Sequence, residues 1–188
     1  MQKMRKGNGM NNLKTLYKEK ISKNLATSLG VKNVMAVPKV EKVVVNVGVG
    51  KTLKDGKMLE AIIEDIKSIT GQTPVKTIAK KSIAGFKIRE GQVVGLVVTL
   101  RGERMYDFLE KLIRVALPRV RDFRGLDEKK FDRHGNYNIG FKEQIVFPET
   151  IREHMDYTFG LEVNIQTSTN SDSHALELLK SLGFPFQK

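Results

Sequence analysis

The stretch Gly48-Val49-Gly50-Lys51-Thr52 contains the residue types that bind phosphate in nucleotide-hydrolysing enzymes, where glycine amides and a lysine surround the anion. That loop requires a further glycine at the position of Val45, which instead lies inside an expected strand. The dinucleotide-binding fingerprint also fails, because Leu53 occupies its third glycine position. The spacing therefore argues against a phosphate-binding enzyme.

The other residues that could do chemistry are too far apart to cooperate. His134, His154 and His174 are the only histidines, and their twenty-residue spacing matches neither a metal site nor a catalytic triad. The chain has no cysteine, which excludes disulfides and thiolate metal sites. We therefore expect structural histidines, no catalytic residue, no cofactor and no metal.

A binding role is favoured by the basic segment 76–91, which contains Phe86 beside Gly85. Its isolated isoleucines cannot form a core, so we expect a mobile arm that stays solvated or binds a polyanion. Glu90 is its only acid. The basic residues of the arm are Lys76, Lys80, Lys81, Lys87 and Arg89, and Ser82 lies among them.

A second basic segment, 119–126, places Phe123 among three arginines. Guanidinium groups grip phosphate with two parallel hydrogen bonds and stack on exposed bases, so an RNA contact is one interpretation. Pairing with Asp122 and Asp127 is the structural alternative. The arginines are Arg119, Arg121 and Arg124.

Composition supports a polyanionic partner. The 188 residues carry a net charge of +12 with a pI near 9.8, which favours nucleic acid first and an anionic membrane second. Residues 1–40 hold nine Lys or Arg and one acid, whereas residues 143–188 hold seven acids and three basic residues, so one end should face the polyanion. With no long apolar run and no signal core, we expect a cytoplasmic protein without a membrane span. We expect residues 1–10 to be a disordered basic extension and residues 11–188 a single domain.

Periodicity indicates the elements that must position these residues. Strand 40–49 should turn Val43, Val45 and Val47 toward a core, while Asn46 lies on a polar opposite face. The fold class predicted is α+β: a largely antiparallel sheet with helices packed on one face and an open RNA-binding face, a two-layer sandwich. The other expected elements are helices 13–29 (capped by Asn11 or Asn12), 58–69, 104–117 and 172–182, and strands 75–78, 92–101, 137–147 and 161–169.

The chain resembles the universal L-five family of bacterial large-subunit ribosomal proteins over about residues 11–188. The motifs that carry the resemblance include Asn46-Val47-Gly48-Val49-Gly50, Gly71-Gln72-Thr73-Pro74, Lys80-Lys81-Ser82-Ile83-Ala84-Gly85-Phe86-Lys87-Ile88-Arg89, Val98-Thr99-Leu100-Arg101-Gly102-Glu103-Arg104-Met105, Pro118-Arg119-Val120-Arg121-Asp122-Phe123-Arg124-Gly125, Glu143-Gln144-Ile145-Val146-Phe147-Pro148-Glu149 and Phe184-Pro185-Phe186.

The resemblance implies a structural constituent of the large ribosomal subunit that binds 5S rRNA and anchors it in the central protuberance. It places the arm, with Lys80, Lys81, Ser82, Lys87 and Arg89, near P-site tRNA, and Arg119, Arg121 and Arg124 near large-subunit rRNA. Further implied partners are a small-subunit head protein, numbered thirteen, and neighbouring 5S-associated ribosomal proteins. The alternative function is a non-ribosomal RNA chaperone. The implied contacts to 5S rRNA are Asn46, Gln72, Phe86 and Thr99, and we add Arg101 to that set.

Overall fold

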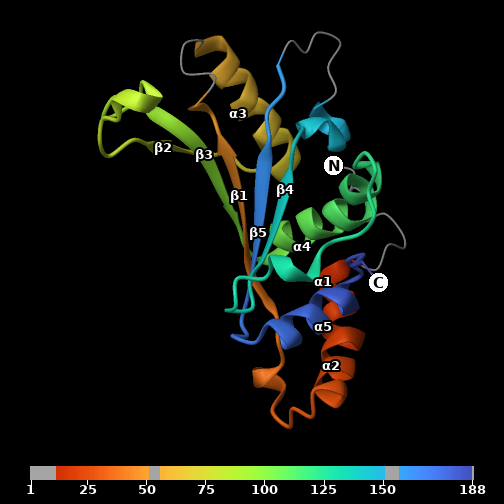
Figure 1. Ribbon diagram of the computed structural model, residues 1–188. Helices are drawn as coiled ribbons and strands as arrows, with labels where there is room; N and C mark the ends of the chain where they lie inside the picture. Colours follow the sequence, from red (N-terminus) through yellow and green to blue (C-terminus); the bar gives the residue numbers. More distant parts are fainter. Residues whose placement is uncertain (1–11, 51–55, 151–156, 188) are drawn as a thin grey trace, which may run out of the picture.

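The computed structural model describes residues 12–50, 56–150 and 157–187 (Figure 1). Within these ranges the chain forms a five-stranded sheet in the order β2-β3-β1-β5-β4, and each pair of neighbouring strands is antiparallel. The extension expected at residues 1–10, and Lys51 and Thr52 of the phosphate-loop-like stretch, lie outside the described residues. The strands are β1 (Val40–Gly48), β2 (Val75–Ile78), β3 (Val93–Leu100), β4 (Tyr137–Phe141) and β5 (Leu161–Thr167).

The central strand β1 has the two faces that its alternation predicts. Val43, Val45 and Val47 are buried, whereas Asn46 is only half-buried and Gly48 is exposed. Because successive side chains of a strand point to opposite faces, this pattern assigns one face of the sheet to the core and leaves the other open. The α+β sandwich with one open face is confirmed.

The helices begin and end where capping chemistry permits. The Asn12 side chain accepts a hydrogen bond from the Lys14 amide at 3.0 Å, and Gly30, with φ of 63°, follows the end of the first helical stretch. This stretch consists of α1 (Leu13–Leu16), a π-helical turn (Tyr17–Ile21) and α2 (Ser22–Ser28). The others are α3 (Gly56–Thr70), α4 (Gly102–Lys111), which continues as a π-helical turn to Ala116, and α5 (Asp172–Leu182).

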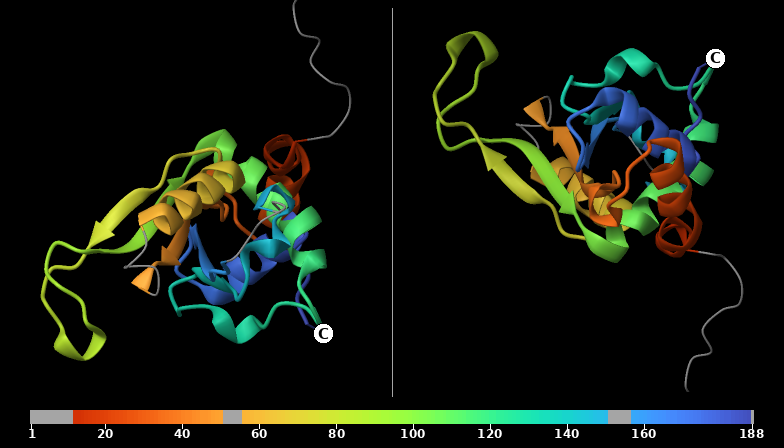
Figure 2. Two further views of the ribbon diagram at one scale, coloured as in Figure 1. Left: turned by 90° about the horizontal axis from the view of Figure 1, so that it is seen from above. Right: turned by 90° about the horizontal axis from the view of Figure 1, so that it is seen from below.

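The core lies between the helices and the buried face of the sheet (Figures 1 and 2). Its helical contributions include Ile62 and Ile66 of α3, Leu109 of α4, and Leu178 and Leu179 of α5, each at most 2% exposed. The segment joining β2 to β3 projects away from this body in both views of Figure 2. No helix in the described part of the chain has the length and apolar character needed to cross a bilayer.

The strand predicted at 137–147 is wrong in its second half. Strand β4 ends at Phe141, and Gln144–Val146 form a 3₁₀ turn that leaves Ile145 46% exposed. The buried Gln144 side chain donates to the Tyr157 carbonyl at 3.1 Å and accepts from the Phe159 amide at 2.9 Å. These bonds satisfy the backbone groups of Tyr157 and Phe159, which lie more than ten residues further along the chain. The local alternation of apolar residues does not show that Gln144 is needed there.

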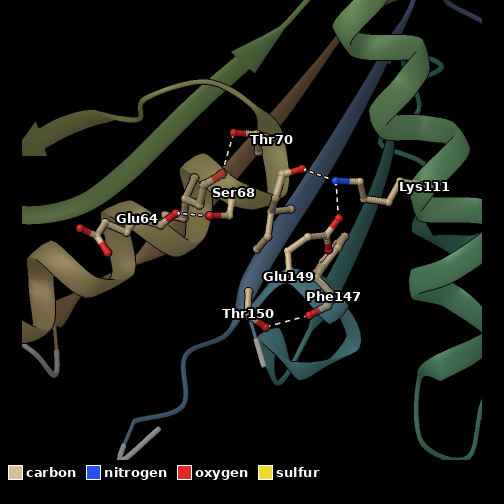
Figure 3. A network of polar contacts seen from close by, with 9 residues as sticks. Glu64, Ser68, Thr70, Lys111, Phe147, Glu149 and Thr150 are labelled. Carbon is tan, nitrogen blue, oxygen red and sulfur yellow. Dashed lines mark hydrogen bonds and ion pairs between the residues drawn. The ribbon is translucent and has the colours of Figure 1, made fainter. Parts of the chain in front are cut away.

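One lysine joins three segments at the end of α3 (Figure 3). Lys111 Nζ donates to the Ile69 carbonyl at 3.0 Å and pairs with Glu149 at 2.6 Å. The last carbonyls of a helix have no partner within the helix and carry partial negative charge, so an ammonium group stabilises them. The contact ties α4 to α3 and to the turn Pro148–Thr150.

Candidate nucleic-acid interface

The open face of the sheet brings Asn46 and Thr99 together. The antiparallel register pairs Thr99 of β3 with Val44 of β1, and Asn46 with Val97. Because side chains two residues apart on a strand share a face, Asn46 and Thr99 are diagonal neighbours on this surface. Thr99 is exposed, and neither side chain has a hydrogen bond to a described residue.

Gln72 and Arg101 lie beside this pair. Gln72 Nε2 donates to the carbonyl of Thr99 at 3.4 Å, which holds the loop before β2 against the end of β3. Arg101 is exposed, follows β3 directly and is the N-cap residue of α4. The structure therefore gathers four of the five residues assigned to 5S rRNA around one part of the open face.

Gly95 of β3 is buried among its neighbours in this part of the sheet. A Cβ at Gly95 would lie 2.7 Å from Thr77 Oγ1 and 3.3 Å from the carbonyl oxygen of Val47. Asn46 Oδ1 is the next atom, at 3.9 Å. Only glycine fits here without displacing Thr77 or the backbone of β1, so Gly95 allows the three strands to pack closely beside Asn46.

The arm is separate from the sheet surface, and Phe86 belongs to it. Phe86 is 74% exposed in a 3₁₀ turn, Ala84–Phe86, at the arm's tip. Ile83 and Ile88 exchange backbone hydrogen bonds at 3.0 and 3.2 Å, and Ser82 Oγ accepts from the Glu90 amide at 2.9 Å. The arm is thus an extended hairpin with its own hydrogen bonds, rather than part of the group around Asn46.

The arm's cations are available to a partner. Lys80, Lys81, Lys87 and Arg89 are exposed, and none forms an ion pair with an acid among the described residues. An unpaired cluster of this kind raises the local concentration of a polyanion.

Segment 119–126 runs beside the edge strand β4. The Tyr137 hydroxyl donates to the Asp127 carbonyl at 2.8 Å, and burial raises the pKa of Tyr137. Segment 119–126 and β4 border one groove, whose lining includes Arg121 and Gly140. Within the described ranges none of the three arginines of this segment pairs with Asp122, Asp127 or another acid, so all three remain exposed cations.

The open face also carries polar residues that were not among the predicted site residues. Asn138 of β4 lies opposite Asn164 of β5, and Asn164 lies opposite Val44. Glu162 lies opposite Asn46, and Gln166 opposite Lys42. The signal was present in the alternation of strand 161–169, where Glu162, Asn164 and Gln166 interrupt the apolar residues.

The chemistry available here is recognition by amides, hydroxyls and cations. Over the described ranges, no group of three or more acidic or histidine side chains could hold a metal ion. Amide and hydroxyl groups on a sheet, with cations at its borders, suit hydrogen bonding to ribose and base edges and ionic contact with phosphates.

Comparison with known proteins identifies the relatives of this chain. Residues 33–89 match the family model described as ribosomal protein L5, and residues 93–186 match the model for the C-terminus of the same ribosomal family. The large ribosomal subunit protein uL5 of Halothermothrix orenii is 56% identical over 92% of this chain and 96% of its own length. The proteins of the same name from Mycoplasma pneumoniae and Oceanobacillus iheyensis are 52% and 50% identical, each over 95% of this chain and 99% and 100% of their own lengths.

Proposed function

From the premise that the chain belongs to the ribosomal protein L5 family, we propose that it binds 5S rRNA through the open sheet face and anchors it in the central protuberance. The protein is a structural, non-enzymatic component of the large ribosomal subunit, with ribosomal RNA as its partner.

The observation that carries the 5S assignment is the polar site on the open face. Asn46 and Thr99 have no hydrogen bond to any described residue, and Gln72 is bonded to the backbone beside them. Asn46 is half-buried and Thr99 is exposed on an uncovered sheet, so their hydrogen-bonding groups are free for a ligand. Amides and hydroxyls can bond to 2′-hydroxyls and phosphates of a folded RNA.

The arm serves a different RNA in this proposal, the P-site tRNA. It projects from the body, its cations are unpaired, and Phe86 offers an exposed ring for stacking. Segment 119–126 contacts large-subunit rRNA through its exposed arginines. Surface loops of the chain contact the small-subunit head protein numbered thirteen. Neighbouring 5S-associated ribosomal proteins are its other protein partners.

A salt titration of the full chain on 5S rRNA and on a tRNA control tests this division. Wild type, Asn46→Ala, Lys80→Ala/Lys81→Ala and a matched amide control, Asn24→Ala on the exposed side of α2, are compared. We expect Asn46→Ala to lose preference for 5S rRNA, the lysine variant to lose tRNA affinity, and Asn24→Ala to behave as wild type. Equal binding of both RNAs by wild type at physiological salt would mean that charge alone drives binding, which defeats the 5S proposal.

A further inference from the structure

The half-buried amide side chains fall into two groups. Those in loops, Gln72, Gln92 and Asn136, each form hydrogen bonds within the protein. Those on the open sheet face form none with any described residue; they are Asn46, Asn138, Asn164 and Gln166. Of these four side chains only Asn164 has a buried polar atom without a partner, whereas the polar groups of the other three reach solvent and are free for a ligand.

Asn164 is the extreme member of this set. Its Oδ1 is buried and has no hydrogen-bond partner. A buried acceptor without a partner costs its desolvation free energy, and a ligand that donates to it removes that cost. The terminal torsion of an asparagine side chain is soft, so rotation about it turns the oxygen toward an arriving donor.

The register extends the predicted 5S site across the sheet. Asn138, Asn164, Val44 and Thr99 occupy one row over β4, β5, β1 and β3. Neighbouring strands lie about 4.8 Å apart, so this row spans about 14 Å. Asn164 and Asn138 thus continue the surface that begins at Thr99 and Asn46.

The charge on the β5–β4 half of the open face determines which chemical group of a ligand can bind there. The exposed Glu162 lies opposite Asn46 and, on its other side, opposite the exposed Gly140. A carboxylate repels phosphate. Both a carboxylate and the amide oxygen of Asn164 accept hydrogen bonds. Nothing lies within 4 Å of a Cβ built at Gly140, which leaves room for close approach. The surface therefore fits a ligand edge rich in hydrogen-bond donors.

We propose that the β5–β4 half of the open face, through Asn164, Asn138 and Glu162, binds the ribose edge of an RNA helix by accepting hydrogen bonds from 2′-hydroxyl groups. The minor groove of an RNA helix is wide and shallow and displays these hydroxyls, which DNA lacks. Phosphates are left to the cations at the ends of the face, where Lys42 lies opposite Gln166 and Arg101 follows β3. The inference rests on the proposed function and adds the chemical group that this half recognises.

The test pairs protein variants with modified RNA. The full chain, Asn164→Ala and the control Asn24→Ala are titrated on 5S rRNA and on copies in which blocks of nucleotides are 2′-deoxy. Asn164→Ala should weaken binding about three- to tenfold, the effect of one hydrogen bond. Deoxy substitution at the contacted block should weaken the wild type at least as much, and should weaken Asn164→Ala less than the wild type, because that variant has one such hydrogen bond fewer to lose. The salt slope should not change, because no phosphate contact is lost.

Glu162→Gln provides a second readout. Replacing the carboxylate by an amide removes the repulsion of phosphate for both nucleic acids, and for RNA alone it also weakens the hydrogen bond from a 2′-hydroxyl. We therefore expect affinity for a DNA copy of the contacted helix to rise while RNA affinity changes little. Discrimination between RNA and DNA should therefore fall. Unchanged discrimination would overturn the role of Glu162.

The outcomes separate the two proposals. If Asn46→Ala weakens 5S binding while Asn164→Ala keeps both wild-type affinity and wild-type sensitivity to deoxy substitution, the further inference is wrong and the proposed function stands. If wild type shows no preference for 5S rRNA, the proposed function fails and the inference with it. If Asn164→Ala lowers the unfolding temperature, Asn138→Ala on the edge strand β4 takes its place in the titrations on 5S rRNA and its 2′-deoxy copies. The expected result is the same.

Discussion

The Tyr17 hydroxyl joins the first helical stretch to the chain entering β1 by donating to the Pro38 carbonyl at 2.8 Å. Burial, with a smaller contribution from Tyr106, raises the pKa of Tyr17 from 10.0 to about 12. The folded state therefore favours the neutral phenol. The stability that this gives is fully present below pH 10 and is lost as the pH rises through about 12.

The prediction concerns alkaline unfolding. Between pH 10.0 and about pH 12 the free energy of unfolding of wild type should fall more steeply than that of Tyr17→Phe, measured by urea denaturation. The phenylalanine variant has no proton to lose at this site, so it isolates the contribution of Tyr17. Parallel pH dependences for the two proteins would contradict the assignment.

Gly135 is a second residue whose replacement should have a large effect on the free energy of unfolding. Its φ is +75°, its amide donates to Asp172 Oδ1 at 2.9 Å, and a Cβ there would overlap the Thr169 carbonyl oxygen. We predict that Gly135→Ala lowers the free energy of unfolding by roughly 3 kcal/mol, through backbone strain and this clash.

Gly140→Ala, on β4, is the matched control for Gly135→Ala, because it has an ordinary φ and open space around a new Cβ. It should change stability by less than about 0.5 kcal/mol. Urea unfolding of both variants makes the comparison, and equal effects would show that the packing around Gly135 is less tight than described.

At the scale of elements, Lys111 is the contact that holds α4, α3 and the turn Pro148–Thr150 together (Figure 3). We predict that Lys111→Met lowers the free energy of unfolding by about 2 kcal/mol, since it removes a hydrogen bond from a charged donor and leaves the Ile69 carbonyl unpartnered. Denaturant titration measures this loss.

The control for Lys111 is an exposed ion pair between other elements. Glu103→Gln breaks the 3.0 Å pair between Lys14 of α1 and Glu103 of α4, whose side chain is 78% exposed, and should leave the free energy of unfolding unchanged within error. If both variants unfold like wild type, Lys111 does not hold the three segments together.

At the scale of the whole molecule, the net charge of +12 makes every RNA interaction dependent on salt. The arm's lysines are exposed and unpaired, whereas the sheet face is built largely from amides and hydroxyls. We predict that Lys80→Ala/Lys81→Ala reduces the slope of log affinity for tRNA against log salt by about 1.5, as expected for two lost phosphate contacts.

Asn46→Ala should leave the corresponding salt slope for 5S rRNA unchanged while lowering the affinity. Filter binding or fluorescence titration at several salt concentrations gives both slopes. A slope for the lysine variant equal to that of wild type would mean that these lysines do not touch phosphate.

Patterns along the chain were enough to predict most elements and the polar face. The alternation of Val43, Asn46 and Val47 identified the two faces of β1, and the strand at 75–78 was placed correctly. These features depend on neighbouring residues and on the period of two, which one sequence displays directly. The charge excess and the basic arm were visible for the same reason.

Tertiary structure alone decided which polar residues share a surface. Gln144 turns inward to bond the backbone near Phe159, so β4 stops at Phe141 although apolar residues continue to alternate. The register that sets Asn138 beside Asn164 follows from packing the buried sides of β4 and β5 into a common core, so residues far apart in the chain determine it. Sequence by itself specified the kind of surface and placed Phe86 in the basic arm, whereas long-range packing determined which polar residues make up that surface.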